Sequence, residues 1–136
     1  MRNLLLPIIA LSSLSACTIT KEKSKNIESI GGTKDQHGCL VAAGQSWSKI
    51  KNNCIQIFNE GLRLNPIEKR NNDAIISSFV IVSDDLKKAE LFTPDNHESI
   101  ILISNDQIQY INGKYYYNAK EGILSIDGIK KYRLEK

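Results

Sequence analysis

The sequence lacks a strong charge of either sign. It contains 18 Lys and Arg residues against 15 Asp and Glu residues, a formal net charge of +3. Arg2 is the only charged residue among the first 16, so removal of that segment leaves 17 basic residues against 15 acidic ones. The basic residues are scattered among the acidic ones, whereas proteins that bind nucleic acid concentrate them on one face. The composition therefore argues against nucleic acid as a partner.

Recognised catalytic and cofactor motifs are also missing. The sequence has no Gly-x-Ser-x-Gly, P-loop, dinucleotide fingerprint, His-Glu-x-x-His or EF-hand loop. It has two histidines, His37 and His97, and neither is accompanied by the signature of a catalytic triad. We therefore predict a protein that is not an enzyme and that uses no metal or other non-covalent cofactor. A glycan hydrolase whose site is built from distant residues stays as an alternative.

An apolar run long enough to span a bilayer is absent as well. The most apolar segment, residues 4–11, follows Arg2 and is shorter than the roughly 20 residues that a spanning helix needs. A positive start, a short apolar stretch and small residues after it are typical of a secretory signal. We predict that residues 1–16 are a signal peptide, that residues 17–34 form a polar tether, and that residues 35–136 form one domain.

The end of this segment, residues 14–17, reads Leu-Ser-Ala-Cys and closely resembles the lipobox of bacterial lipoproteins. In that class the cysteine receives a diacylglyceryl group, the signal is cut before it, and the new amine is acylated, commonly with palmitate. The resemblance implies that Cys17 is lipidated and that the bilayer is a partner, because several acyl chains anchor durably. By the enterobacterial sorting rule, Thr18 implies the outer membrane of the cell envelope, facing the periplasm. The alternative is ordinary cleavage after Ala16, which leaves Cys17 as a free thiol.

Three cysteines occur in the chain. If Cys17 carries lipid, Cys39 and Cys54 remain as an even pair in an oxidising compartment. A disulfide between them would close a loop of about 15 residues and contribute roughly 3 kcal/mol in the chain-entropy model. Metal binding is the alternative, because His37 lies close before Cys39, but further ligands at matching spacing are missing.

After Cys39, apolar residues recur at helical spacing. Ser46 is a suitable N-cap and Gly61 a suitable end, so the spacing predicts a helix over residues 46–60. Its apolar face would consist of Trp47, Ile50, Cys54, Ile57 and Phe58. On that face Trp47 is expected as a core residue in preference to a ligand platform.

The second half of the chain favours strands separated by turn residues. The predicted strands cover residues 74–82, 89–92, 99–103, 107–111, 115–118, 123–126 and 131–134. The pairs Asn112-Gly113 and Asp127-Gly128 suit type I′ hairpins. Such short, closely spaced segments leave no room for crossover helices. We therefore predict an α+β fold, in which one disulfide-stapled helix precedes an antiparallel meander of five to seven strands, as a curled sheet or small barrel.

A cluster of tyrosines beside a lysine lies in this half. Tyr115 and Tyr117 are expected on one face of a strand and Tyr116 on the other. Tyrosine is common at interfaces, because it buries a large area and keeps a polar group. Lys114, Tyr115 and Tyr117, together with Trp47, are therefore candidate binding residues. The alternative is that these aromatic side chains only pack the sheet.

Two further resemblances concern the domain. The residues Gly38-Cys39, Ala43-Gly44, Trp47 and Cys54-Ile55 resemble a pattern in small bacterial lipoproteins of unknown function with a β-rich C-terminal half, over about residues 35–134. The segment Gly113-Lys114-Tyr115, followed by Gly122, resembles part of the inhibitory loop of the membrane-bound C-type lysozyme inhibitors, which are lipoproteins with a small antiparallel barrel. The Ser-rich part of that loop is absent here.

Together these observations predict a membrane-anchored envelope lipoprotein with a binding or structural role. Its partner would be another envelope protein or a small ligand. The alternative is an inhibitor of lysozyme or of another cell-wall hydrolase.

Overall fold

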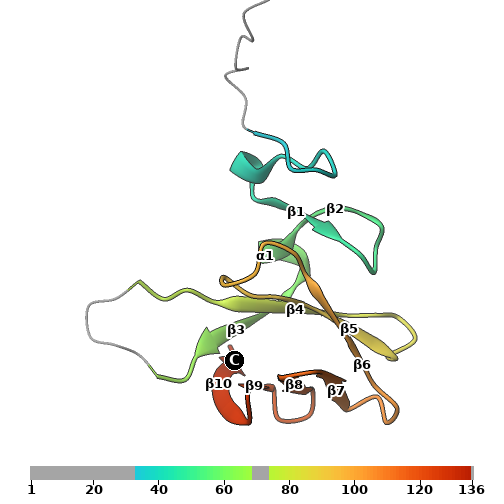
Figure 1. Cartoon of the computed structure of the whole chain (residues 1–136), viewed down its shortest axis with the longest axis vertical. Coiled ribbons are helices and arrows are strands. Elements are labelled where there is room, and N and C mark those ends of the chain that lie inside the picture. Colours follow the sequence, from blue (N-terminus) through green and yellow to red (C-terminus); the bar gives the residue numbers. More distant parts are fainter. Residues whose placement is uncertain (1–32, 69–73, 136) are drawn as a thin grey trace, which may run out of the picture.

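The computed structural model describes residues 33–68 and 74–135. The predicted signal peptide, nearly all of the predicted tether, and Cys17 lie outside the described residues. The described part is built almost entirely of strands, with one disulfide and very little helix (Figure 1). It is therefore a β-rich fold, and the predicted α+β class is wrong.

Eight strands form a closed barrel in which each strand pairs antiparallel with the next in the chain. Pairing of the last strand with the first closes it. The strands are β3 (Leu62–Pro66), β4 (Ser78–Val82), β5 (Lys88–Phe92), β6 (Ile100–Ile103), β7 (Gln109–Asn112), β8 (Tyr115–Asn118), β9 (Ile123–Ile126) and β10 (Ile129–Leu134). The last seven correspond to the seven predicted strands, and the barrel is the curled form of the predicted meander.

The two predicted hairpin turns differ in type. Asp127 and Gly128 connect the paired residues Ile126 and Ile129, and both have positive φ, as a type I′ turn requires. In the other hairpin, Asn112 already pairs within β7, so the central residues are Gly113 and Lys114. There the first central residue alone has positive φ, +56°, as in a type II′ turn. The prediction of type I′ at Asn112-Gly113 is therefore wrong by one residue of register.

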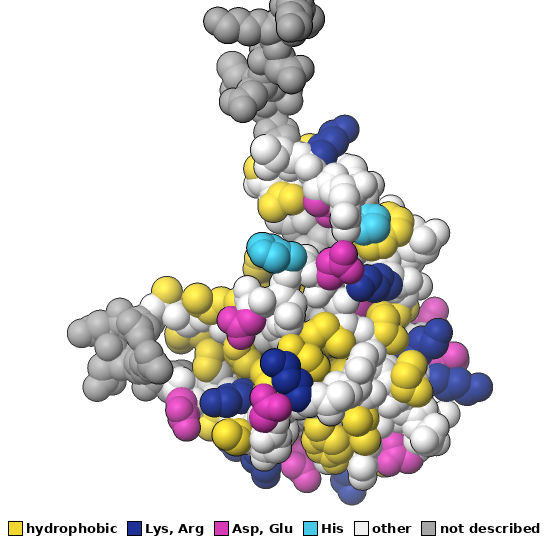
Figure 2. Space-filling model, viewed as in Figure 1, with side chains coloured by type: hydrophobic (Ala, Val, Ile, Leu, Met, Phe, Trp, Pro, Cys, Tyr) yellow, Lys and Arg dark blue, Asp and Glu magenta, His cyan; other side chains and the backbone are white. Residues whose placement is uncertain are grey.

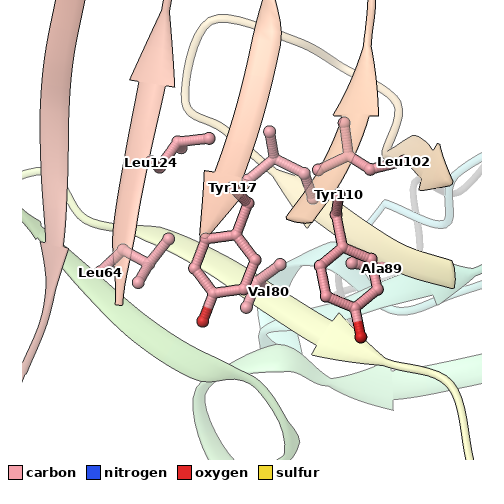
Figure 3. Close-up of a cluster of buried hydrophobic side chains, with 8 residues drawn as sticks. Leu64, Val80, Ala89, Leu102, Tyr110, Tyr117 and Leu124 are labelled. Carbon is pink, nitrogen blue, oxygen red and sulfur yellow. The ribbon is translucent and has the colours of Figure 1, made fainter. Parts of the chain in front are cut away.

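Side chains fill the inside of the barrel (Figure 3). The fully buried cluster takes at least one residue from each strand from β3 to β9: Leu64, Val80, Ala89, Leu91, Leu102, Tyr110, Tyr117 and Leu124. Tyr110 donates its hydroxyl to the backbone carbonyl of Leu86 at 3.0 Å, which satisfies its buried polar end. Burial raises the pKa of both Tyr110 and Tyr117, so both stay neutral well above pH 7. The lumen is a packed core.

The segment predicted as a helix is instead a two-stranded hairpin, β1 (Gln45–Ser48) and β2 (Asn53–Gln56), followed by the four-residue helix α1 (Ile57–Glu60). In the hairpin Trp47 lies opposite Cys54, and Asn52 takes a positive φ of 50° in the turn. In the hairpin Ile50 lies in the turn, and the buried residue of β2 is Ile55, which the predicted helical face left out. The predicted helix over residues 46–60 is wrong.

The hairpin and α1 lie over the outside of the barrel at β4 (Figure 1). Ile55 and Ile57 pack there against Phe79 and Ile81, with Phe92 beside them. This second apolar cluster lies on the opposite face of the strands from the lumen, because successive residues of a strand alternate between faces. The hairpin is thus attached to the barrel wall by a small core of its own.

The predicted disulfide between Cys39 and Cys54 is confirmed, with a Cα–Cα distance of 5.5 Å. Cys39 is fully buried and Cys54 lies in β2. The bond therefore connects the loop that begins the described chain to the hairpin. Leu40, next to Cys39, also forms an isolated antiparallel bridge with Lys34.

Candidate binding cleft

A cleft of about 610 Å³ lies between the N-terminal loop, the hairpin and the end of β5. Its walls come from residues 35–37, from β1 with the following Lys49, and from residues 92–99, which end β5 and form the loop to β6. Ligand sites commonly measure roughly 300–1,000 Å³ and combine apolar walls with a few placed polar groups. The cleft has this size and this mixture.

The aromatic part of the cleft is a stack of two rings. The centroids of His37 and Trp47 are 4.7 Å apart, and the two planes are within 10° of parallel. Trp47 is half-buried and belongs to neither buried apolar cluster, so it is not the core residue that the predicted helix implied. The disulfide at Cys39, two residues after His37, holds the loop that brings the imidazole to the indole.

Glu98 connects the polar side chains at the rim of the cleft. Its carboxylate accepts hydrogen bonds from the side chains of Gln36 and Lys49, each at 3.1 Å. Lys49 also donates to the backbone carbonyl of Ser99 at 2.8 Å. The hydrogen bond and charge of Lys49, with the hydrogen bond of Gln36, hold the pKa of Glu98 below its usual range. Three separate segments therefore meet at this one carboxylate.

The cleft rests on a fully buried acid, Glu90, in the middle of β5. Its carboxylate accepts four hydrogen bonds: from the hydroxyls of Ser48 and Ser99 at 2.6 and 2.5 Å, and from the backbone N–H groups of Lys49 and Ile50 at 2.7 and 3.1 Å. Buried carboxylates are tolerated where such donors replace water. Glu90 therefore fixes the hairpin turn and the β5–β6 loop in relation to each other.

The β5–β6 loop carries a second polar contact, at Asn96. Its side-chain amide donates to the hydroxyl of Thr93 at 2.7 Å and to the phenol oxygen of Tyr115 at 3.0 Å. Both amide hydrogens are thus engaged, and the carbonyl oxygen of Asn96 is the group left to accept. This contact connects the cleft wall to the start of β8.

The predicted binding residues are not brought together. Trp47 lies in the cleft, and Tyr115 reaches the cleft wall only through Asn96. Tyr117 is 1% exposed inside the barrel, where it packs in the core. Lys114 is exposed in the β7–β8 turn, with its ammonium 5.4 Å from the centroid of the Tyr115 ring.

Sequence reasoning missed most of the cleft. His37 and His97 both line it, and Figure 2 shows both histidines on one face of the molecule with acidic and basic side chains close by. Sequence could have pointed to His37, because a disulfide two residues away was predicted. Nothing in the sequence marks Glu98 or the buried Glu90 among the 15 acidic residues.

The described residues contain no group of three or more His, Cys, Asp or Glu side chains that could hold a metal ion. The cysteine of the candidate His37–Cys39 ligand pair is consumed by the disulfide. The cleft offers a ligand an aromatic surface, a rim that contains the Lys49–Glu98 ion pair, and acceptors for hydrogen bonds.

Comparison with models of protein families, with curated proteins and with solved structures finds no match for this chain. Within residues 33–68 and 74–135, no helix is long and apolar enough to cross a membrane.

Proposed function

We propose that this chain is a lipid-anchored envelope protein of non-enzymatic role, and that its domain binds another envelope component in the cleft at Trp47. The anchor rests on the lipobox at residues 14–17 and its Cys17. The observation that supports binding is the cleft itself, an open hollow of about 610 Å³ with an aromatic stack on one wall and a hydrogen-bonded rim.

The position of the cleft in the chain suits a tethered receptor. Its first wall, residues 35–37, follows the predicted tether directly in sequence. A chain of the length from Cys17 to Asp35 spans at most about 65 Å when fully extended. The domain would therefore search a shell of that depth at the membrane surface, where a bound envelope component is held close to the bilayer.

Membrane fractionation tests the anchor. The variant Cys17→Ala removes the acceptor for lipid, and we expect it to leave the membrane fraction while the disulfide of Cys39 and Cys54 still forms. A variant that has lost residues 1–16, as its mass shows, and still stays in the membrane fraction as completely as the natural chain would contradict the lipid anchor.

Site-specific photocross-linking in intact cells tests the cleft. A photoreactive residue at Val41, which lines the cleft and is 54% exposed, should give a defined adduct. The matched control is Ile129, 55% exposed in β10 and outside the cleft. The adduct at Val41 should disappear when Trp47→Ala is added. Equal cross-linking at both positions, or none at Val41, would argue against binding in the cleft.

A second candidate, inhibition of a cell-wall hydrolase, is favoured by the β7–β8 turn. Gly113 has open space around it and Lys114 is exposed, so the turn offers a free projection with a cation. A closed small barrel also agrees with the fold that the resemblance to the C-type lysozyme inhibitors implies. The protein should then inhibit C-type lysozyme, and Lys114→Ala should weaken the inhibition. Absence of inhibition at micromolar protein removes this candidate.

A further inference from the structure

The walls of the cleft carry two half-buried aromatic side chains in addition to the histidines. Trp47 comes from β1 and Phe92 from the end of β5. Stacking on His37 covers one face of the indole and fixes its plane, so the opposite face of Trp47 is the flat surface that a ligand would meet. A rigid flat surface suits a ligand with a flat apolar face of its own.

The acidic and basic side chains that line the cleft already have partners: Asp35 accepts hydrogen bonds from the backbone N–H groups of His37 and Cys39. Lys49 and Glu98 form an ion pair at 3.1 Å, and the side-chain amide of Gln36 donates a hydrogen bond to the other oxygen of the Glu98 carboxylate. A strongly charged ligand would have to compete with these contacts to gain a partner. A neutral ligand with many hydroxyl groups would add hydrogen bonds and leave the pair intact.

Hydrogen-bond acceptors and donors line the cleft at more than one point. Asn96 offers its carbonyl oxygen, because both of its amide hydrogens are already donated. Ser46, next to Trp47 on β1, also lines the cleft. Hydroxyls at the edge of a ring stacked on Trp47 would find such groups among the residues that line the cleft.

These features suit a sugar, because a sugar ring has an apolar C–H face and hydroxyl groups around its edge. We propose that the cleft binds a neutral oligosaccharide, with one ring stacked on Trp47 and its hydroxyls bonded to Asn96 and to the Gln36–Glu98 pair. A volume of about 610 Å³ suits a short segment of a chain, and the open form of the cleft lets the chain continue past it. This ligand class rests on the proposed function and makes it more specific.

The chain provides its own reporter, since Trp47 is its single tryptophan. We would extract the full protein from membranes in detergent and titrate it with the β-1,4-linked tetramer of N-acetylglucosamine, with cellotetraose and with maltotetraose. At least one of these should shift the Trp47 emission in a saturable way. Tetra-alanine, a neutral peptide of comparable length, should not.

Variants distinguish a stacked sugar from a non-specific effect, with calorimetry as the readout where the tryptophan is removed. Trp47→Ala should weaken binding by about tenfold or more, as loss of a central aromatic contact does, whereas Trp47→Phe should retain most of it. Asn96→Ala should weaken binding without altering the Trp47–His37 stack. Lys51→Ala is the matched control, since Lys51 lies in the same hairpin, pairs with Glu60 and does not line the cleft.

The outcomes separate this inference from the proposed function. Failure of all three oligosaccharides, with the Val41 adduct still formed in cells, overturns the sugar and leaves an envelope component of another class in the cleft. Binding of tetra-alanine with the same dependence on Trp47 also overturns it, in favour of a peptide. Saturable sugar binding without a cellular adduct supports the ligand class and contradicts the proposed function.

Discussion

Glu90 and Ser48 lie 42 residues apart in the chain, and the hydroxyl of Ser48 donates to the buried Glu90 carboxylate at 2.6 Å. Ser99 donates to the same carboxylate from the other wall of the cleft. The relative position of the two walls therefore depends on one acid that does not itself line the cleft. Its loss should affect both stability and binding.

We expect Glu90→Gln to lower the free energy of unfolding by about 2 kcal/mol. An amide replaces one acceptor oxygen with a donor, which leaves at least one buried N–H or O–H unpaired at a cost of about 1–3 kcal/mol. Urea unfolding measures the change. Lys88→Gln, exposed on the same strand, is the control and should change stability by less than about 0.5 kcal/mol. Equal effects of the two substitutions would show that Glu90 does not hold the hairpin.

Removal of the disulfide should also be costly. The double variant Cys39→Ser with Cys54→Ser opens a loop with a sequence separation of 15 residues. The free energy of unfolding should fall by about 3 kcal/mol. Thermal unfolding with and without reductant checks this, because reductant should lower the Tm of the natural protein and leave that of the variant unchanged. A natural protein with the same Tm in both conditions would contradict the expected contribution.

The rim of the cleft should respond to acid through Glu98. Its folded pKa lies below the ordinary 4.5 because Lys49 and Gln36 bond to the charged form. The unfolded chain therefore takes up the proton first on acidification. The stabilisation is present above about pH 4.5 and is lost as the pH falls through the lowered pKa of Glu98.

Carboxyl titration by NMR measures this lowering directly. In Lys49→Met the pKa of Glu98 should move up toward 4.5. Asp106 is the internal control, since the backbone N–H groups of Gln109 and Ile108 are the main cause of its lowered pKa. Movement of both carboxyl groups would indicate a general structural change and not the loss of one partner.

The packing of the end of β10 depends on a close approach between Gly122 and Leu134. The φ of Gly122 is +65°, and a Cβ there would lie 2.6 Å from the Cβ of Leu134. Gly122→Ala should therefore lower the free energy of unfolding by about 1 kcal/mol, because alanine disfavours the left-handed conformation, and by a further 1–3 kcal/mol, because the added methyl group overpacks the contact. At Gly128 φ is +76° with nothing within 4 Å, so Gly128→Ala should cost the first part alone. Chemical unfolding of the two variants should differ accordingly, and equal losses would contradict the contact with Leu134.

Much of the barrel could be predicted from sequence. Strands β8 and β9 begin and end at the predicted residues, because turn residues precede the first at Asn112-Gly113 and follow the second at Asp127-Gly128. β3 was missed, since only Leu64 of its five residues is fully buried and gives no alternating pattern. Closure of the sheet could not be derived either, because it depends on the pairing of β3 with β10, residues far apart in the chain.

The cleft was largely beyond sequence reasoning. The apolar spacing after Cys39 fits a helix, but the contacts of Ile55 and Ile57 with β4, which local spacing does not reveal, go with the hairpin. That error placed Trp47 in a core. Pairing of Glu98 with Lys49, 49 residues apart, follows only from the folded hairpin.

The proposed attachment of this small barrel to a membrane depends on the lipidation of Cys17. Mass spectrometry of the protein purified from its native membranes tests this directly. We predict a chain that begins at Cys17, carries the mass of a diacylglyceryl group and an acyl group on that residue, and contains one bridge, between Cys39 and Cys54. A Cys17 that is unmodified, or bonded to another cysteine, would contradict the account.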